Sequence, residues 1–303
     1  MTMHNPYIPG EAIAAAVDTA AEFIIGHPPA PTLLPGMQEQ FNITPEDELR
    51  EQVAGIIDWH ARNSPRSLQT ALGPSEIGHP CSRKIAYHIL DAPRINPGFD
   101  VLPSEIGTAY HERMANHLLA ENIRLGRERY LVETRVTVWE AGEGGIGNLT
   151  GSADCYDKDA QRVIDWKILG NSSMKKTGLH GPIVSYKRQL QMYGKGFERE
   201  GYPVKDVALV AIPRAGTTSG IRAYIDPYDP DEAERVHERW INIVVLVDIL
   251  GVERNPEGMY AIEAVGENCE FCPWFTRRPD ASGLQCSGPG PKTPAEAAAA
   301  GGR

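Results

Sequence analysis

Two acids and a lysine stand at the ends of two short apolar runs. In the stretch LTGSADCYDKDAQRVIDWKILG, residues 149–170, Asp154 follows the first run, Asp165 follows the second, and Lys167 comes two residues later. Two carboxylates on one rim bind a hard divalent cation through oxygen, and a neighbouring lysine can polarise a phosphate or orient a water. A bound cation acidifies water and stabilises charge on a leaving oxygen. This chemistry fits phosphodiester hydrolysis, although D-x-K alone more often marks the end of a surface strand.

Five cysteines form a second group that could do chemistry: Cys81, Cys155, Cys269, Cys272 and Cys286. The two residues between Cys269 and Cys272 let two thiolates meet one metal centre from a tight turn. The first residues do not resemble a secretory signal, and an odd number of cysteines is poor evidence for a disulfide scaffold. The spacing therefore favours a thiolate-bound metal centre.

The composition limits the class of protein. The chain has 303 residues, enough for one large domain or two small ones. The net charge of −10 argues against a basic protein that coats nucleic acid nonspecifically, but it allows a local basic channel. Three basic pairs could line such a channel or form solvated surface: Arg83-Lys84, Lys175-Lys176 and Lys187-Arg188. The sequence contains no membrane-spanning apolar run and no phosphate-binding loop of a motor, so we expect a cytoplasmic protein without a membrane partner.

Periodicity predicts the elements that must position these residues. We expect helices in residues 44–63, 80–92, 104–123, 183–201 and 229–251, with an Ala-rich helical piece before residue 44. We expect strands in residues 130–141, 147–157, 162–169, 206–214 and 220–228. This order indicates an α/β domain with a mixed central sheet.

The strand period places the candidate groups. Side chains two apart face the same side of a strand, so Asp165 and Lys167 project together and Trp166 points away. If the preceding strand pairs as a hairpin, Asp154 reaches the same face. Cys155 then points away from the candidate site, into the core.

These residues, in this order, resemble the PD-(D/E)xK nuclease superfamily, with Asp154 and Asp165-Trp166-Lys167 as the motif core. His111 in GTAYHERM resembles the helix histidine of the RecB-like branch. Gln189 and Tyr193 match its Q-x-x-x-Y motif and, four residues apart, share a helix face. One cysteine before the core and three after it resemble the iron–sulfur subgroup, which includes the Cas-four CRISPR-associated exonucleases, their phage-encoded relatives and AddB-type recombination nucleases. The resemblance covers roughly residues 72–288.

The resemblance implies a fold and a set of roles. The fold would be a restriction-endonuclease-like mixed central sheet flanked by helices, with an iron–sulfur-bound C-terminal segment. His111, Asp154, Asp165 and the backbone carbonyl of Trp166 would bind Mg²⁺ or Mn²⁺, and an imidazole ligand suits Mn²⁺ better. Lys167 would be the catalytic lysine. The roles of the remaining residues have alternatives: Gln189 and Tyr193 would position DNA or the lysine, His111 could be a plain helix histidine, and Glu112 and Glu133 could support the ligands or lie on solvated surface.

The cysteines have alternatives too. By the resemblance, Cys81, Cys269, Cys272 and Cys286 would hold a structural [4Fe–4S] cluster. Four thiolates also fit tetrahedral zinc, and unligated buried cysteine is a further alternative. The loop between Cys272 and Cys286 is longer than is usual in the family, so Cys286 is the least secure ligand. A second departure is Ile168, where the family often has a small hydroxyl residue after the lysine.

The domain boundaries and the function follow from these assignments. We expect an N-terminal helical extension of unknown role in residues 1–70, a nuclease domain with the cysteine cluster in residues 71–288, and a flexible tail in residues 289–303. The expected activity is that of a metal-dependent DNA exonuclease acting on single strands or DNA ends. The alternative is a noncatalytic iron–sulfur or zinc DNA-binding or adaptor module. Phage recombination or replication, host repair and CRISPR spacer processing, with corresponding partner proteins, are the candidate settings, and the Ala- and Gly-rich composition favours a phage of a GC-rich host.

Overall fold

The computed structural model describes residues 44–64, 72–96, 100–142, 147–266, 269–277, 279 and 285–290. The chain divides into two compact units, Met1–Ile56 and Ile57–Arg303. The Ala-rich helix expected before residue 44 and residues 291–303 of the expected tail lie outside the described residues. The helix expected in residues 44–63 is confirmed as α3, Pro45–Arg62. The Asp47 amide donates to Thr44 Oγ1 at 3.2 Å and the Thr44 amide donates to Asp47 Oδ2 at 3.3 Å, which caps its first turn.

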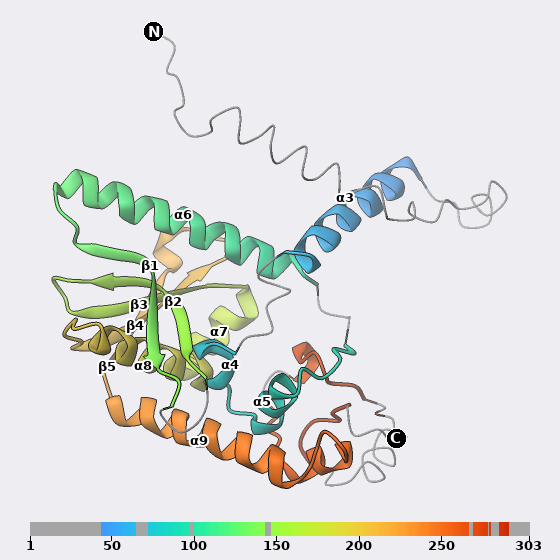
Figure 1. The fold of residues 1–303 in the computed structure, drawn as a ribbon. Coiled ribbons are helices and arrows are strands. Elements are labelled where there is room, and N and C mark those ends of the chain that lie inside the picture. Colours follow the sequence, from blue (N-terminus) through green and yellow to red (C-terminus); the bar gives the residue numbers. More distant parts are fainter. Residues whose placement is uncertain are drawn as a thin grey trace, which may run out of the picture. The chain divides into compact units, whose positions relative to one another are not determined.

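Five strands form one mixed sheet in the order β1-β2-β3-β4-β5 (Figure 1). They are β1 (Tyr130–Trp139), β2 (Leu149–Asp157), β3 (Arg162–Leu169), β4 (Asp206–Pro213) and β5 (Arg222–Pro227). Neighbouring strands are antiparallel except β3 and β4, which are parallel and joined through α7 (Asn171–His180) and α8 (Val184–Arg199). The expected α/β class with a mixed central sheet flanked by helices is confirmed.

Helices α6 (Leu102–Leu125) and α8 cover opposite faces of this sheet (Figure 1). On the α6 side, Trp166, Cys155 and Ile212 pack against Met114 and Leu118. The α8 side holds a larger apolar cluster that includes Leu190, Tyr193 and Phe197 from the helix and Val136, Tyr156, Val163 and Leu209 from the sheet. The sheet is therefore the middle of three layers, with α6 on one face and α8 on the other.

A third core joins segments from both ends of the unit. This core contains the helices α4 (Pro74–Ile77), α5 (Ser82–Ile89) and α9 (Pro230–Ile249). They pack with the C-terminal segments that carry the short helices η2 (Pro256–Ala261) and η3 (Cys269–Phe271). The Arg83 side chain is buried here and donates to the carbonyls of Ile262 at 3.0 Å and Tyr260 at 3.2 Å. The Trp274 indole donates to the Ala92 carbonyl at 2.9 Å. These bonds tie the cysteine-bearing segments together.

Two of the α-helices, α4 and α7, were not predicted from the sequence. Most other elements are one to three residues shorter at an end than expected, α6 extends two residues further at each end, and β3 spans the expected residues 162–169. Among the described helices, none is long and apolar enough to cross a lipid bilayer.

Candidate active site

The sheet is irregular where the two expected acids lie. Val132 pairs with Cys155 and Thr134 pairs with Ala153, but the intervening step, Glu133 opposite Asp154, is missing from the ladder. Glu133 has a φ of +47°, in the left-handed region that costs an L-residue energy. β2 pairs with β3 only over residues 155–157, so the two strands separate at Asp154.

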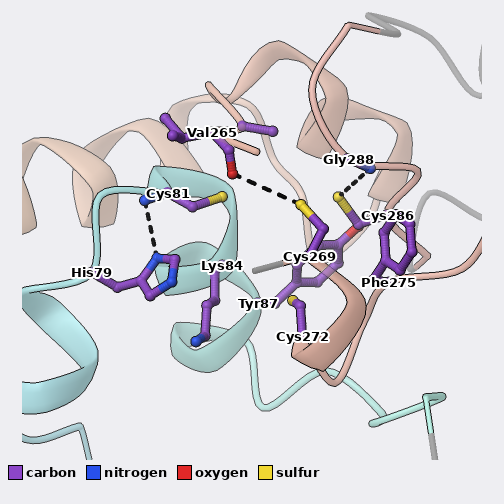
Figure 2. Close-up of a pocket in the computed structure, with 11 residues that line it drawn as sticks. His79, Cys81, Lys84, Tyr87, Val265, Cys269, Cys272, Phe275, Cys286 and Gly288 are labelled. Atoms are coloured by element: carbon purple, nitrogen blue, oxygen red, sulfur yellow. Dashed lines mark hydrogen bonds between the residues drawn. The ribbon is translucent and has the colours of Figure 1, made fainter. Parts of the chain in front are cut away.

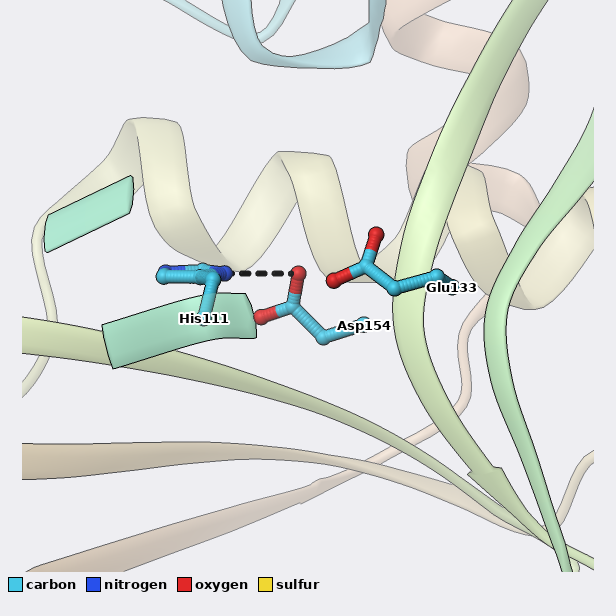
Figure 3. A group of neighbouring side chains, drawn as sticks. All are labelled: His111, Glu133 and Asp154. Atoms are coloured by element: carbon cyan, nitrogen blue, oxygen red, sulfur yellow. Dashed lines mark hydrogen bonds and ion pairs between the residues drawn. The ribbon is translucent and has the colours of Figure 1, made fainter. Parts of the chain in front are cut away.

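The Asp154 side chain fills the gap between the separating strands. Its Oδ2 accepts a hydrogen bond from the Trp166 amide at 3.0 Å, in place of a ladder partner. Its Oδ1 lies 3.2 Å from His111 Nδ1, which α6 brings to the site (Figure 3). The Asp154 residue is only 7% exposed. Asp154 is thus fixed by two contacts, and its backbone neighbour Cys155 points into the α6-side core, as expected.

β3 supplies the second carboxylate and the lysine. Lys167 Nζ donates to Asp165 Oδ1 at 3.0 Å and lies 2.8 Å from Oδ2. From α8, Gln189 Nε2 donates to Asp165 Oδ1 at 3.3 Å and to the Tyr193 hydroxyl at 3.3 Å. The expected shared face of Asp165 and Lys167 is present, with the Trp166 side chain on the opposite, α6 side. Gln189 and Tyr193 lie on one face of α8, as their four-residue spacing predicts, and Gln189 contacts the Asp165 carboxylate.

Close packing keeps this arrangement tight. A Cβ on Gly151 of β2 would meet Pro74 Cδ at 2.8 Å and Tyr193 Cε1 at 2.9 Å, so only glycine allows β2 to approach α4 and α8 this closely. Tyr193 is buried, and burial raises its pKa to about 12, which keeps the hydroxyl protonated near neutral pH. Tyr193 can therefore donate or accept a hydrogen bond but does not act as a base.

The electrostatics of the pair favour a cation in the site. Asp165 is 1% exposed, and the Lys167 ammonium, 2.8 Å from Oδ2, is its ion-pair partner. Burial, reinforced by the negative charge of Asp154, raises the pKa of Asp165 to about 6. Burial alone would lower the pKa of Lys167, but Asp165 and Asp154 outweigh it and the pKa is raised, so the lysine stays protonated. An added positive charge would stabilise both carboxylates in their ionised form.

A third acid lies beside the first carboxylate. Ligand atoms of His111, Glu133 and Asp154 all fall within 4.8 Å of one another, and no other such group of acids, histidines or cysteines occurs among the described residues (Figure 3). Ser152 Oγ donates to Glu133 Oε2 at 3.2 Å. Glu112, the other acid considered from the sequence, is exposed and outside this group. An imidazole with two carboxylates is a chemically suitable ligand set for Mn²⁺ or Mg²⁺.

The structure also brings four of the five cysteines together. Cys81, which precedes α5, Cys269 and Cys272 around η3, and Cys286 line one small cavity (Figure 2). The long Cys272–Cys286 segment returns because the Cys286 amide donates to the Trp274 carbonyl at 2.8 Å and the Thr276 amide donates to the Cys286 carbonyl at 2.9 Å. Cys286, the least secure ligand by sequence, therefore lies with the others.

Polar groups surround these thiols. The Gly288 amide donates to Cys286 Sγ at 3.3 Å, and Arg83 Nη1 lies 3.8 Å from the same sulfur. Burial, followed by the neighbouring thiols, raises the pKa of Cys269 to about 11. Because the four cysteines line one cavity, a cation bound among them would favour the thiolates.

Comparisons with known proteins add the following. No family model matches the sequence, and no curated protein matches it. A solved structure designated SSO0001 aligns with a TM-score of 0.44 at 18% identity, over 73% of this chain and 94% of that one. The alkaline exonuclease LHK-Exo from Laribacter hongkongensis aligns with a TM-score of 0.38 at 13% identity, over 59% and 92%. A phage-related exonuclease from Haemophilus somnus 129PT aligns with a TM-score of 0.36 at 14% identity, over 57% and 82%. Similarities of this size leave the function to be argued from the residues of the site.

Proposed function

We propose that the protein is a metal-dependent DNA exonuclease of the RecB-like PD-(D/E)xK type. The observation that supports this most is the convergence of His111, Asp154, Asp165 and Lys167, which come from α6, β2 and β3, in the lining of one cavity. A binding module has no need for two buried carboxylates, Asp154 and Asp165, that line a cavity beside the Lys167 ammonium group. Burying charged groups in this way is costly, and such clusters of ionisable groups concentrate at functional sites.

The proposed roles follow from the contacts. His111, Asp154, Asp165 and the carbonyl of Trp166 would hold Mg²⁺ or Mn²⁺, and Glu133 joins this set because it shares the 4.8 Å group with His111 and Asp154. The bound ion would acidify a water and offset charge on the scissile phosphate. Lys167, held at Asp165, would orient the attacking water and neutralise a phosphate oxygen. Gln189 would fix the Asp165 rotamer through its 3.3 Å hydrogen bond, and Tyr193 would in turn hold Gln189.

We also propose that the four clustered cysteines hold a [4Fe–4S] cluster with a structural role. A tetrahedral zinc site with a Zn–S distance of about 2.3 Å needs sulfurs about 3.8 Å apart. The cysteine sulfurs are spread more widely than a zinc site requires. In the described chain, no three of them lie within 4.8 Å of one another, the separation that the ligand atoms of His111, Glu133 and Asp154 satisfy. This spacing favours a larger centre than a single ion. The cluster would join Cys81, which precedes the sheet in the chain, to Cys269, Cys272 and Cys286, which follow it.

The proposed setting is DNA processing in the cytoplasm, with phage recombination or replication ahead of host repair or CRISPR spacer processing. DNA would be the substrate and no membrane would be involved. Recombination or CRISPR proteins would be its partners. A noncatalytic iron–sulfur or zinc adaptor is the second candidate, and it predicts DNA binding without cleavage.

Digestion of labelled DNA tests the proposal. Anaerobically purified protein is mixed with linear single-stranded, linear double-stranded and closed circular DNA, each with Mg²⁺, with Mn²⁺ and with a chelator. We expect nucleotides to be released progressively from linear DNA, only with a divalent ion, while circular DNA stays intact. Cleavage of closed circular DNA would show that the protein is an endonuclease. Tight binding with no cleavage under any metal condition would favour the adaptor.

A further inference from the structure

The cavity that contains the carboxylates continues to the cysteine-bearing segment. It has a volume of about 650 Å³ and is lined both by Asp154 and Asp165 of the sheet and by Arg94 and Phe271. A second cavity of about 340 Å³ adjoins it, shares Lys84 and Phe271 as lining residues, and reaches α7 and α8. Together the two cavities form a path that leads past Lys84 and Phe271 to the proposed metal site.

Basic side chains line the part of this path that the proposed hydrolysis does not use. Lys84, Arg94 and Arg135 all line the larger cavity. None of the three forms an ion pair with an acid in the described part of the chain, although Arg135 donates to Thr150 Oγ1 at 2.5 Å. The nearby Glu76 carboxylate is engaged by the Gly73 amide at 3.0 Å and the Ser75 hydroxyl at 2.8 Å. Lys84, Arg94 and Arg135 therefore offer groups along the path that can contact phosphates.

Two of these cations also affect a neighbouring histidine. His88 also lines the cavity, and burial, followed by the charges of Lys84 and Arg94, lowers its pKa to about 4. The ring stays neutral near neutral pH. It adds no positive charge and packs edge-on against Trp274, with ring centroids 4.6 Å apart.

Phe271 projects from the turn between Cys269 and Cys272 and is 62% exposed. Asn96 Nδ2 holds this turn by donating to the carbonyls of Glu270 at 3.2 Å and Cys272 at 3.0 Å. An exposed aromatic ring on an anchored turn, beside cations that line the same cavity, matches how proteins bind single-stranded nucleic acid: cations contact the phosphates and a base stacks on the ring.

We infer that single-stranded DNA binds along this path, with phosphates at Lys84, Arg94 and Arg135 and a base stacked on Phe271. The inference rests on the proposed nuclease function and specifies its substrate and the approach to the site. The exposed ring supports one strand, because the bases of a duplex stack on one another and are not free to stack on Phe271. The cysteine centre would thereby act on the substrate indirectly, by fixing the turn that carries Phe271.

Binding without catalysis tests the inference. A fluorescent oligothymidine is titrated with anaerobic full-length protein in a chelator, and its anisotropy is measured. Phe271→Ala should weaken binding about 5- to 150-fold, and Phe271→Trp should restore it. Ile249→Ala is the matched control, because Ile249 is 74% exposed on α9 and does not line the path. Replacing Lys84, Arg94 or Arg135 by glutamine should each reduce the slope of log affinity against log salt by about 0.7.

The outcomes separate this inference from the proposed function. Unchanged binding by Phe271→Ala, or no binding by the wild-type protein at low salt, overturns the inference even if the protein cleaves DNA. An equal loss of single-stranded and duplex binding in Phe271→Ala overturns the choice of a single strand. A selective loss of single-stranded binding supports the inference even if wild-type protein cleaves nothing, in which case only the nuclease proposal fails.

Discussion

Replacing Glu133 by glycine and by glutamine separates backbone strain from ligand chemistry. At a φ of +47°, an L-residue in β1 costs about 1–2 kcal/mol. Glycine removes that cost but loses about 0.5–1 kcal/mol of chain entropy within a strand. The net gain for Glu133→Gly is about 0.5–1 kcal/mol of unfolding free energy, which raises Tm by about 1–4 °C in a unit of this size. Glutamine keeps the strain and gives no gain.

Both variants remove the carboxylate next to His111 and Asp154. If that carboxylate helps to hold the metal ion, each variant should weaken Mn²⁺ binding about 10-fold or more. The assays are thermal unfolding without divalent ions and calorimetric titration with Mn²⁺. Gln161→Gly is the matched control, because Gln161 has a φ of +54° in the turn between β2 and β3 and is not part of the ligand group. It should gain similar stability and keep full Mn²⁺ affinity.

Two results would refute this reasoning separately. If Gln161→Gly gains stability and Glu133→Gly loses it, the unusual φ of Glu133 is not a source of strain. If both Glu133 variants bind Mn²⁺ as tightly as wild-type protein, Glu133 lies on solvated surface and the ligand set returns to the residues expected from the sequence.

The remaining predictions concern Gln189, the cysteines and His88. Gln189→Leu removes a donor to Asp165 and should lower kcat about 10- to 100-fold, with a fall in Tm similar to that of Gln191→Leu; Gln191→Leu, which loses its hydrogen bonds to Pro227 and Asp229, should lower Tm and leave kcat unchanged. Alanine at Cys81, Cys269, Cys272 or Cys286 should abolish brown absorbance near ~400 nm and reduce solubility, whereas Cys155→Ala should keep the colour, and iron and zinc analysis decides the identity of the centre. The pKa of His88 is about 4 in the folded state and about 6.5 in the unfolded state. The contribution of His88 to stability is therefore fully present above about pH 6.5 and is lost as the pH falls toward 4. Between about pH 8 and about pH 5 wild-type protein should lose up to about 2 kcal/mol more unfolding free energy than His88→Gln, with partial exposure of the ring reducing the difference; equal losses in chemical unfolding would show that His88 does not titrate this way.

The sequence predicted the sheet because its signals are local. β-branched, alternating runs bounded by turn residues mark β1, β2 and β3, and capping residues mark α3 and α9. Two helices were not predicted. α4 has only four residues, and α7, NSSMKKTGLH, has no apolar stripe and contains a glycine. Such helices are held by their surroundings, which a local pattern does not reveal.

Some residues of the candidate site could likewise be placed from local sequence patterns, and others could not. Asp165 and Lys167 follow from the two-residue period of a strand, and their contact is observed at 2.8 Å. Glu133 could not be placed, because its position depends on a left-handed residue and a missed pairing in the β1–β2 ladder, and glutamate carries no preference for that conformation. The position of Cys286 required the return of the segment after Cys272, which long-range backbone bonds to residues 274 and 276 determine.

Cleavage of single-stranded DNA by Asp165→Asn and Lys167→Met, compared with wild-type protein, tests the central claim most directly. Both substitutions are close in size to the residues they replace, so circular dichroism and cluster absorbance should be unchanged and the comparison isolates the chemistry. With end-labelled DNA and Mn²⁺ we expect wild-type protein to release nucleotides and both variants to release none above background. Wild-type rates in either variant would show that the carboxylate–lysine pair is not the catalytic centre and that the cleavage comes from elsewhere.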